Sequence, residues 1–427
     1  MQRAVDIHAN KVGGSNPAAR FKRGLESMTL RSMASDLPPD EQWVSISYRT
    51  EEGQDLEYRQ EWIVFSPNRE SITRDAAFDM SDYSTKMGID HTTDRIRNMK
   101  QIIFGPHHDI EDQEILAKSK SIRDQVTGVE SLTTRIPNVY DPKKISDDIG
   151  YIHIKSFNSK IPQGFEGNWV VTLIEEFRQL IMALPKKGLI VDVRGNPGGI
   201  IPFAEIILQF LTPNEITPEP YSFICSPLTL ELSRLDPDAK DWNHSISEAL
   251  STGSIFSAGY PLTNKDDMNL VGQVYYGPVI LITDALCYSA TDLFAASFQD
   301  HKIGDILGVD ETTGAGGANV WKYGDLTENL RKSDKYKLKD LPYEPFRLSL
   351  RRNVRVGEHA GTPVEDLGIK PDIIYNMTRR DVLEGDIDLI KKASEILAGK
   401  QVKQLEVLIS DENDSLKIEL VSVGISR

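Results

Sequence analysis

The hydrophobic positions between residues 148 and 398 alternate between strand-like and helix-like patterns. Short apolar runs, such as 189–193 and 279–282, predict buried strands, whereas the apolar positions over 169–184 recur at helical spacings. The predicted elements are, in chain order, a strand at 151–154, a helix over 169–184, a strand at 189–193, a helix from about Ile201, a strand at 279–282, a helix over 290–298 and strands around 303–309, 348–354 and 369–375. This succession predicts an α/β fold with crossover connections.

The residues ahead of this region predict two other units. Residues 1–66 carry strand-like runs at 43–48 and 62–65 around a polar turn at 51–55, which favours a small β-rich module. Residues 67–147 are polar and weakly periodic, so we interpret them as a mostly surface connector with some helix.

Two further segments interrupt or follow the layered domain, which we assign to residues 148–398. Prolines and an acidic stretch indicate an insertion at about 212–275. Near the end of the domain, 378–381 resembles a capping box at the start of a helix. The last residues, 399–427, hold two strand-like runs around a polar turn at 411–415, which predicts a small C-terminal β-hairpin.

The composition is that of a folded, acidic chain. Hydrophobic residues make up 39% and charged residues 26% of the 427 residues, and 64 acidic against 49 basic side chains give a formal net charge of −15. A general binder of nucleic acid or of an anionic membrane needs a basic surface, so we expect neither partner. The two cysteines cannot form a disulfide framework, and no Cys/His spacing resembles a zinc site, so no metal is expected.

No targeting or membrane segment is evident in this sequence. The longest apolar runs are the size of strands, and residues 1–20 hold no apolar core. The sequence therefore predicts a soluble protein without a signal peptide, cytoplasmic by default.

Ser289 is the first candidate for chemistry. It follows the strand at 279–282 and precedes a helix with an apolar face, and the amides at the start of such a helix can stabilise an oxyanion on a carbonyl that the serine attacks. Serine is also a favoured N-cap residue, and this structural role explains the local pattern as well. The signature Gly-x-Ser-x-Gly is absent, because Cys287 and Thr291 occupy its glycine positions.

Two loops offer further chemistry. The glycines of 194–199, which follow a buried strand, allow close approach to a ligand, a second oxyanion donor, or simply a tight turn between strand and helix. Neither these glycines nor those of 314–317 have the spacing of a phosphate or dinucleotide loop, so no nucleotide cofactor is expected. Glu365, in the loop 362–372, can orient a histidine or polarise a hydroxyl, although a lone loop acid is more often only solvated.

The order of five segments is more specific than any one of them. In succession the chain carries 150–157, 188–199, 289–300, 312–317 and 365–372, with the sequences GYIHIKSF, GLIVDVRGNPGG, SATDLFAASFQD, TTGAGG and EDLGIKPD. This order resembles the serine peptidases of family S41, the tail-specific or C-terminal-processing peptidases, over roughly residues 150–395.

The resemblance implies a core of the ClpP/crotonase-like type, with residues 1–66 as a partial PDZ-like peptide-binding module. It implies a nucleophile at Ser289 and oxyanion-stabilising amides at Ala290 and in the turn of Gly198 and Gly199. The implied activity is that of a serine-type endopeptidase, which hydrolyses polypeptides through an acyl-enzyme and needs no cofactor. A PDZ-like module implies recognition of the polypeptide through a chain end.

The general base is the residue that the resemblance does not supply. The processing branch of the family pairs its serine with a lysine, and that position holds Ala315, so a Ser/Lys pair is not expected. A second branch, which includes the tricorn core protease and the chlamydial protease-like activity factor, uses serine, histidine and glutamate, and Glu365 fits its acid. The histidine of that branch lies before or near the PDZ-like module, where this chain offers only His8. His91 is closest in its local sequence but follows the module.

The remaining histidines are expected to be structural or solvated; they are His107, His108, His153, His244, His301 and His359. Two interpretations stay open. The chain is either a peptidase whose histidine segment precedes Met1, or a peptidase-like scaffold that binds peptides without cutting them efficiently, since loss of a base lowers the rate by several orders of magnitude. An acyl-CoA enzyme on a crotonase-like core is a third class, but such an enzyme needs neither Ser289 nor the Glu365 loop.

Overall fold

The computed structural model of this chain describes residues 2–12, 14–29, 40–50, 52–62, 129–158, 167–339, 347–400, 404–412 and 415–423. Most of the predicted connector and residues 63–65 of the second predicted strand lie outside these ranges.

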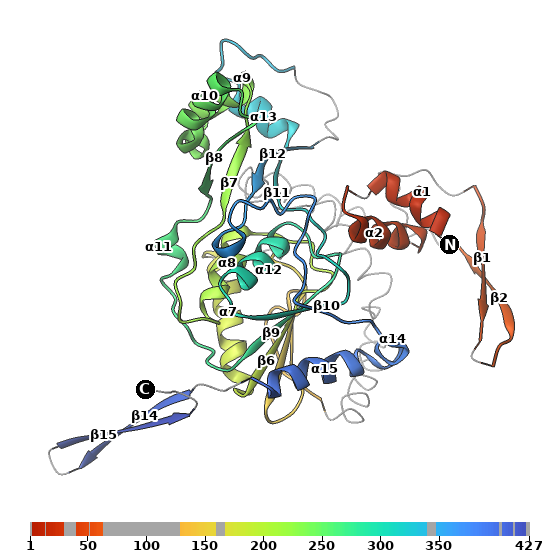
Figure 1. Ribbon diagram of the computed structural model, residues 1–427, viewed down its shortest axis with the longest axis vertical. Coiled ribbons are helices and arrows are strands. Elements are labelled where there is room, and N and C mark those ends of the chain that lie inside the picture. The colour runs from red at the N-terminus through yellow and green to blue at the C-terminus, as the bar shows by residue number, and fades with distance from the viewer. Residues whose placement is uncertain are drawn as a thin grey trace.

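A seven-stranded mixed sheet forms the centre of the molecule (Figure 1). Five neighbouring strands are parallel, and the two strands at one edge are antiparallel. In spatial order the strands are β13 (Ile373–Ile374), β10 (Gly304–Gly308), β9 (Val279–Thr283), β6 (Gly188–Asp192), β5 (Ile149–Ile154), β4 (Tyr140–Lys144) and β3 (Glu130–Ser131). β6 and β9 are buried along their whole length, as expected for parallel strands covered on both faces, which explains their uninterrupted apolar runs.

Helices cover both faces of this sheet, as the alternation of strands and helices predicts. Successive side chains of a strand point to opposite faces, so Leu189 and Val191 of β6 pack in a larger core while Ile190 packs in a smaller one. The helices over the larger core are α7 (Trp169–Ala183), α8 (Ile201–Gln209) and α12 (Ala290–Asp300), and α15 (Ile387–Ala398) covers the smaller one. The α/β prediction is confirmed.

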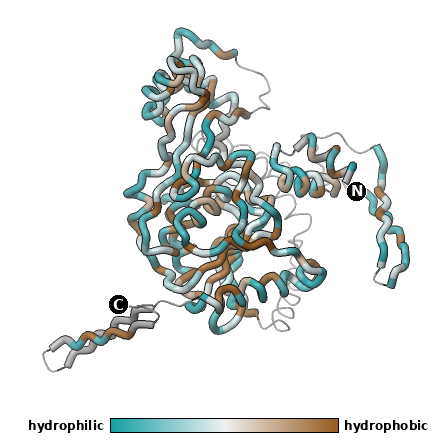
Figure 2. The backbone as a smooth tube through the Cα atoms, in the orientation of Figure 1, coloured by the Kyte–Doolittle hydropathy of each residue, from teal (hydrophilic) through white to brown (hydrophobic). Residues whose placement is uncertain are grey.

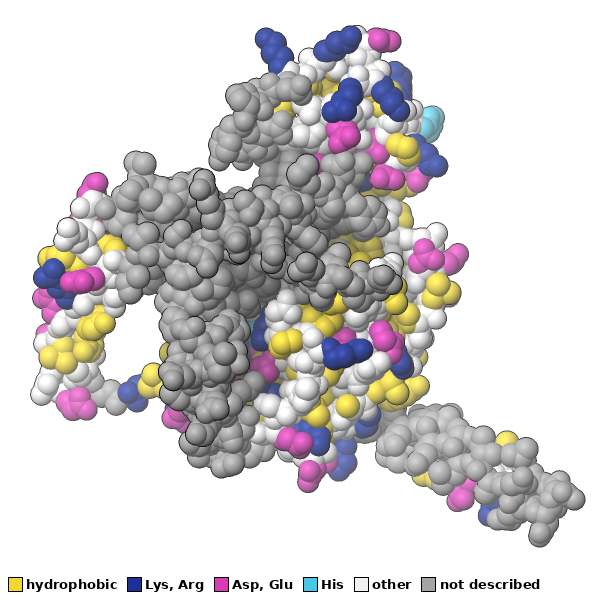
Figure 3. Space-filling model, turned by 180° about the vertical axis from the view of Figure 1, so that it is seen from behind, with side chains coloured by type: hydrophobic (Ala, Val, Ile, Leu, Met, Phe, Trp, Pro, Cys, Tyr) yellow, Lys and Arg dark blue, Asp and Glu magenta, His cyan; other side chains and the backbone are white. Residues whose placement is uncertain are grey.

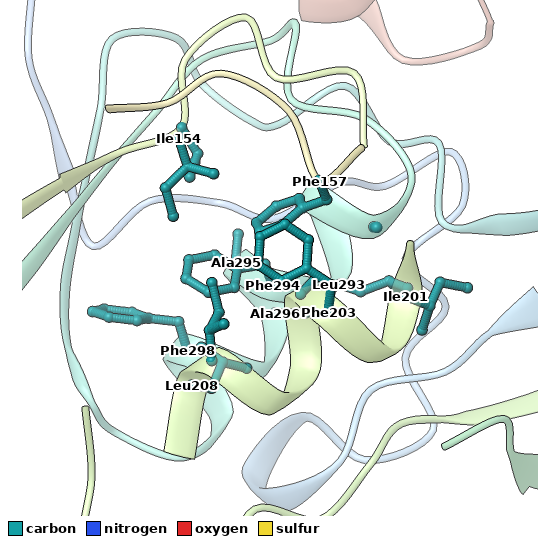
Figure 4. Packing of buried hydrophobic residues seen from close by; sticks show 14 of the residues in the cluster. Ile154, Phe157, Ile201, Phe203, Leu208, Leu293, Phe294, Ala295, Ala296 and Phe298 are labelled. Carbon is teal, nitrogen blue, oxygen red and sulfur yellow. The ribbon is translucent and has the colours of Figure 1, made fainter. Parts of the chain in front are cut away.

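Aromatic side chains fill the larger core between α8 and α12 (Figure 4). The ring of Phe157 lies 5.4 Å from that of Phe203 and 5.3 Å from that of Phe294, measured between centroids, within the range that favours aromatic pairs. The most hydrophobic part of the backbone tube is the central sheet (Figure 2). The segment that follows β5 is therefore anchored in the core through Phe157.

The central sheet includes strands ahead of residue 148, the predicted start of the central domain. β3 and β4, at 130–144, already belong to the central sheet, and Tyr140 is buried with its hydroxyl donating to the Leu173 carbonyl of α7 (2.7 Å). β4 ends in the polar sequence Asp-Pro-Lys-Lys, so the hydrophobic pattern of the sequence does not predict a strand there. The predicted connector therefore contributes two strands to the central sheet.

A four-stranded antiparallel sheet projects from the core as an arm, at the top of Figure 1. The predicted insertion supplies two of its strands, but 318–322 and 347–353 supply the other two. The arm consists of β7 (Pro220–Ile224), α9 (Pro227–Leu235), η1 (Pro237–Trp242), α10 (Asn243–Thr252), β8 (Phe256–Pro261), β11 (Ala318–Lys322), α13 (Tyr323–Asn329) and β12 (Arg347–Asn353), with α11 (Lys265–Met268) on the return to the core. The predicted strand at 348–354 thus lies in the arm, and that at 369–375 is reduced to the short β13.

The last described residues form a small hairpin. The C-terminal β-hairpin, β14 (Gln404–Glu412) with β15 (Ser415–Val423), confirms the prediction. The capping box at 378–381 is also present and starts α14 (Arg379–Glu384).

The N-terminal module is only partly β-rich. It begins with two helices that the sequence reading did not predict, α1 (Gln2–Val12) and α2 (Pro17–Thr29). A hairpin of β1 (Trp43–Arg49) and β2 (Asp55–Glu61) follows, so its second strand lies ahead of the predicted 62–65. One hairpin does not identify a PDZ-like fold, and the PDZ-like module stays a prediction.

The surface is mixed in charge. Seen from behind, acidic and basic side chains are interspersed over the arm and over the visible part of the lower body (Figure 3). Within the ranges that the structure describes, no helix is both long and apolar enough to cross a membrane.

A cluster of buried polar groups lies where the arm joins the core. Glu205 of α8 and Glu219, just ahead of β7, are 2% and 1% exposed, and Tyr221 and Asn353 beside them are buried as well. Burial raises the pKa of Glu205 to about 7, and burial together with the charge of Glu205 raises the pKa of Glu219 well above its usual range. The folded protein therefore holds these protons at pH values where the unfolded chain has lost them.

Replacing Glu205 with glutamine is expected to stabilise the protein at alkaline pH. Below the ordinary glutamate pKa of 4.5 the carboxyl group is protonated in both states, and stability is lost as the pH rises from there through about 7, because only the unfolded chain ionises. At about pH 8 the loss reaches as much as about 3 kcal/mol, and glutamine avoids it. Urea unfolding at acidic and alkaline pH measures the difference, with Glu248→Gln, exposed on α10, as the control. Equal stabilities of wild type and Glu205→Gln at alkaline pH would contradict this expectation.

Candidate active site

Four loops meet at one edge of the central sheet. They follow the carboxyl ends of β5, β6, β9 and β10, which are adjacent and parallel, so the loops leave the sheet on the same side (Figure 1). Open α/β sheets bind their ligands outside these carboxyl ends. The predicted glycine turn, Ser289 and the glycine-rich loop all lie here.

Ser289 occupies a strained turn between β9 and α12. Its φ is 55° and its ψ is −122°, a region that residues other than glycine rarely enter and that costs about 1–3 kcal/mol. The residue stands at the N-cap position of α12, but its side chain makes no capping hydrogen bond. The N-cap interpretation thus accounts for the position of Ser289 and not for its conformation, whereas a strained serine between strand and helix is typical of a nucleophile.

The glycine turn at Gly198 lies directly against Ser289. A Cβ atom on Gly198, whose φ is 99°, would lie 2.7 Å from the Cβ of Ser289 and 2.9 Å from the amide nitrogen of Ala290, so only glycine fits. The Gly198 carbonyl accepts a hydrogen bond from the Phe157 amide (2.9 Å), and its own amide donates to Oδ1 of Asn196 (2.9 Å). The structure therefore brings together Ser289, Ala290 and the glycine turn, which the resemblance grouped in one site.

Two residues hold this turn and the serine turn together, and sequence reasoning missed both. Asn196, fully buried, donates from its side-chain Nδ2 to the Ile154 carbonyl (3.0 Å), and its backbone carbonyl accepts from the Tyr288 amide (3.1 Å). Asp284 accepts at Oδ1 from the amides of Gly195 (3.0 Å) and Leu286 (3.0 Å). The sequence gave a partial indication of both roles, because Asn196 and Asp284 are polar residues close to buried strands, where polar groups need hydrogen-bond partners.

The glycine-rich loop at 312–317 encloses the ring of Tyr288. Cβ atoms added to Gly314 and Gly316 would lie 2.5 Å and 2.7 Å from atoms of this ring. The Gly314 amide also donates to the Cys287 carbonyl (2.7 Å). The glycines are therefore explained by close packing on the residue before Ser289, and Ala315, at the position of the lysine in the processing branch, lies between them with a φ of 63°.

Asp292, three residues after Ser289, joins the serine turn to this loop. Its buried carboxylate accepts from the hydroxyl of Thr313 (2.5 Å) and from the amides of Ala315 (3.1 Å) and Gly316 (2.9 Å). It also accepts from the Ser289 amide, and burial raises its pKa to about 7 against these donors. The sequence places Asp292 three residues after Ser289, at the start of a predicted helix, where a carboxylate can accept from backbone amides. The sequence analysis nevertheless assigned Asp292 no role.

Glu365 belongs to the same group of loops. Its carboxylate is half-buried, accepts from the Ser349 hydroxyl (3.3 Å) and has a pKa raised by burial. The next residue, Asp366, donates its amide to the Ala315 carbonyl (3.1 Å), and a Cβ on Gly317 would lie 3.0 Å from the Glu365 nitrogen. Glu365 thus lies beside the glycine-rich loop that packs on the serine turn.

Each described histidine has an identified partner other than Ser289. His153 bonds to the Arg194 carbonyl (3.1 Å), His301 accepts from the Thr217 amide (2.8 Å), and His359 pairs with Asp300 (2.8 Å). His244 is exposed and lies 3.3 Å from Glu248. The side chain of His8, together with His91, His107 and His108, lies outside what the structure describes. The general base therefore stays unassigned.

No cluster of three or more His, Cys, Asp or Glu side chains in the described ranges is arranged to hold a metal ion. A surface cavity of about 520 Å³ lies elsewhere, lined by Pro278 and Val279 at the start of β9 and by Gly304 at the start of β10. The amino ends of these strands are opposite the edge that carries Ser289, so this cavity is separate from the candidate active site.

Comparison with known proteins gives a family match over part of the chain and a shared fold. The family model of peptidase family S41 matches residues 148–329, which include the glycine turn and Ser289 but not Glu365. No curated protein sequence matches the chain.

Solved structures resemble this chain over most of its length. Mature CPAF complexed with lactacystin has a TM-score of 0.53 and 15% sequence identity, over 92% of this chain and 76% of that chain. Mature CPAF has a TM-score of 0.52 and 15% identity, over 92% and 74%. The photosystem II D1 C-terminal processing protease, with a TM-score of 0.30 and 15% identity over 53% and 42%, is too distant for an argument. At these identities the likeness to CPAF shows a shared fold.

Proposed function

We propose that this chain, whose residues 148–329 match the model of peptidase family S41, is a serine-type endopeptidase that cleaves polypeptides through an acyl-enzyme on Ser289. The observation that carries the proposal is the turn of Ser289, which is strained and packs against Gly198. Strain of this kind persists only where the surroundings impose it, and here Asn196, Asp284 and Asp292 do so.

We assign the oxyanion hole to the amides of Ala290 and Gly199. The amide of Gly198 is already bonded within its turn. In a trans peptide an N–H points opposite to the preceding carbonyl, and the Gly198 carbonyl points toward Phe157. The Gly199 amide is therefore directed away from β5, toward the side of β6 where β9 and the Ser289 turn lie.

The proposed reaction follows from these positions. The Ser289 hydroxyl oxygen attacks the carbonyl carbon of the scissile peptide while a general base removes the hydroxyl proton. The two amides stabilise the negative charge that develops on the carbonyl oxygen. Collapse of the tetrahedral intermediate breaks the C–N bond, the leaving amine takes the proton from the base, and an ester remains on Ser289. Water then attacks this ester by the same route and releases the new carboxyl end.

Glu365 is proposed to orient the base. Its Oε1 accepts from Ser349, and a carboxylate has further lone pairs that can receive an imidazole N–H. Ala315 at the lysine position disfavours a lysine base, which leaves a histidine. His91 remains the candidate from the sequence.

A polypeptide is the partner that this chemistry requires. With a net charge of −15, neither nucleic acid nor an anionic membrane is proposed as a partner. A PDZ-like module built around the β1–β2 hairpin would add recognition of a chain end.

A second function is favoured by one observation. Since Ala315 stands at the position of the lysine in the processing branch, a catalytically impaired peptide-binding protein is the alternative. Acyl-CoA chemistry is not proposed, because the matching family is one of peptidases.

A fluorophosphonate probe separates the two functions. Such a probe forms a covalent bond only with a serine whose proton is removed and whose oxyanion is stabilised. We expect the intact protein to be labelled, with the label on the peptide that contains Ser289 by mass spectrometry. Absence of labelling, together with retained binding of denatured polypeptides, would support the impaired binding protein instead.

A further inference from the structure

The two N-terminal helices form a compact unit beside the candidate active site (Figure 1). α1 and α2 pack closely, because a Cβ on Gly24 would lie 2.4 Å from the Val5 carbonyl oxygen. The side chains of Val5 and Ala9 on α1 and of Ala19 on α2 are buried. We refer to α1 and α2 together as the helical cap.

Asn16 joins the helical cap to two loops of the site. It is 5% exposed, and its Oδ1 caps α2 through the Ala19 amide (3.0 Å) while accepting from the Thr312 hydroxyl (3.2 Å). Its Nδ2 donates to the carbonyls of Asp366 (3.4 Å) and Leu367 (3.3 Å). One buried carboxamide therefore ties α2 to the start of the glycine-rich loop and to the residues after Glu365.

Lys22 reaches the segment that leads to Ser289. Its ammonium group lies 3.3 Å from Oδ2 of Asp310. The same carboxylate oxygen accepts from the Ala285 amide (3.0 Å), in the turn after β9. This contact links α2 to the serine turn through one intermediate side chain.

Arg23 contacts the residue before Ser289 directly. Its guanidinium carbon lies 4.4 Å from the centre of the Tyr288 ring, and its side chain is only 13% exposed. This distance and burial favour a cation–π interaction. The ring is also enclosed by Gly314 and Gly316, so Arg23 completes the packing around the side chain on which the serine turn depends.

We propose that the helical cap positions the catalytic loops, with Arg23 as the positioning residue of the Ser289 turn. The cap contacts the serine turn at Tyr288, the start of the glycine-rich loop and the residues after Glu365, and it leaves Ser289 half-buried rather than sealed. Its contacts therefore restrain the site without covering it. The effect on catalysis rests on the proposed function of Ser289, whereas the restraint of the loops does not.

The test compares Arg23→Ala, Arg23→Lys and Arg3→Ala in the full chain; Arg3 is exposed on α1 and serves as the matched control. Arg23→Ala is expected to lower kcat on a denatured polypeptide, and the rate of fluorophosphonate labelling, about tenfold with an unchanged KM. Lysine keeps a cation over the ring, so Arg23→Lys is expected to recover most of this loss. Hydrogen exchange of the peptides covering 285–292 and 312–317 is expected to accelerate in Arg23→Ala alone.

Two results would overturn the proposal. If Arg23→Ala is labelled and exchanges hydrogen at the same rates as the wild type, the Arg23–Tyr288 contact does not restrain the loops. If Arg23→Ala is labelled faster than the wild type, the cap obstructs the site. If the wild type itself is not labelled, the proposed function of Ser289 fails, and the exchange of the two peptides still decides whether the cap holds the loops. Circular dichroism of the α-helical content of each variant excludes unfolding as the cause.

Discussion

Replacing Ser289 with alanine is expected to abolish fluorophosphonate labelling and to lower polypeptide hydrolysis by roughly 10⁴–10⁶-fold. The acyl-enzyme forms on the serine oxygen, and no other group in the proposed mechanism replaces it. Hydrolysis of a denatured, fluorescently labelled polypeptide and gel detection of the probe measure the two effects. Ser254→Ala, which removes a serine from the surface of the arm, is the control.

Ser289→Gly separates the loss of chemistry from a loss of fold. Glycine accepts the φ of 55° without strain, so this variant is expected to be as inactive as Ser289→Ala and more stable than it by about 1 kcal/mol. Urea unfolding measures the stabilities. A variant that keeps wild-type labelling would show that another residue is the nucleophile, and a Ser289→Gly variant less stable than Ser289→Ala would argue against a strained turn.

The central fold was predictable because most of its strands and helices have a recognisable pattern of hydrophobic residues. β6 and β9 are uninterrupted apolar runs, since both faces of the sheet are covered. β4 was missed because it is a polar strand beside the sheet edge, identified only by the burial of Tyr140 against α7. The helical cap was missed because its buried residues are few and small, among them Ala9 and Ala19, which leaves little hydrophobic contrast.

The candidate site was predictable to the extent that it is local in sequence. Ser289 and the glycine turn are recognisable because a strand, a turn and a helix follow one another within a few residues. Asn196 and Asp292 act through backbone groups that are distant along the chain, such as the Ile154 carbonyl and the Gly316 amide. Residue identity does not encode such partners, so these roles required the structure.

The loops around Ser289 share one mode of support. Carboxylate and carboxamide side chains bond to backbone groups of these loops: Asn196, Asp284 and Asp292 accept from amides within the core, and Asn16 of the helical cap donates to the carbonyls of Asp366 and Leu367. Hydrogen bonds to buried polar groups are expensive to lose. The loops are therefore held in one arrangement before a substrate arrives, which is what oxyanion stabilisation requires.

Gly198→Ala is expected to lower the rate of labelling and of hydrolysis by roughly 10²–10³-fold, the effect of losing an oxyanion-hole donor. A methyl group at this position would lie 2.6 Å from the Tyr288 carbonyl oxygen and 2.7 Å from the Ser289 Cβ. Backbone atoms cannot yield as a flexible side chain does, so the glycine turn and the serine turn must separate. The Gly199 and Ala290 amides would then no longer converge on one oxygen.

Gly195→Ala is the matched control, because it isolates backbone strain from the clash. Gly195 lies in the same turn with a φ of 68°, and a Cβ there would meet no atom within 4 Å. Both substitutions place alanine at positive φ and are expected to lower the free energy of unfolding by about 1–2 kcal/mol, but only Gly198→Ala moves the serine turn. Stability from urea unfolding and labelling rates at saturating probe separate the two contributions. Equal labelling rates for the two variants would mean that the close approach of Gly198 to Ser289 does not form the oxyanion hole.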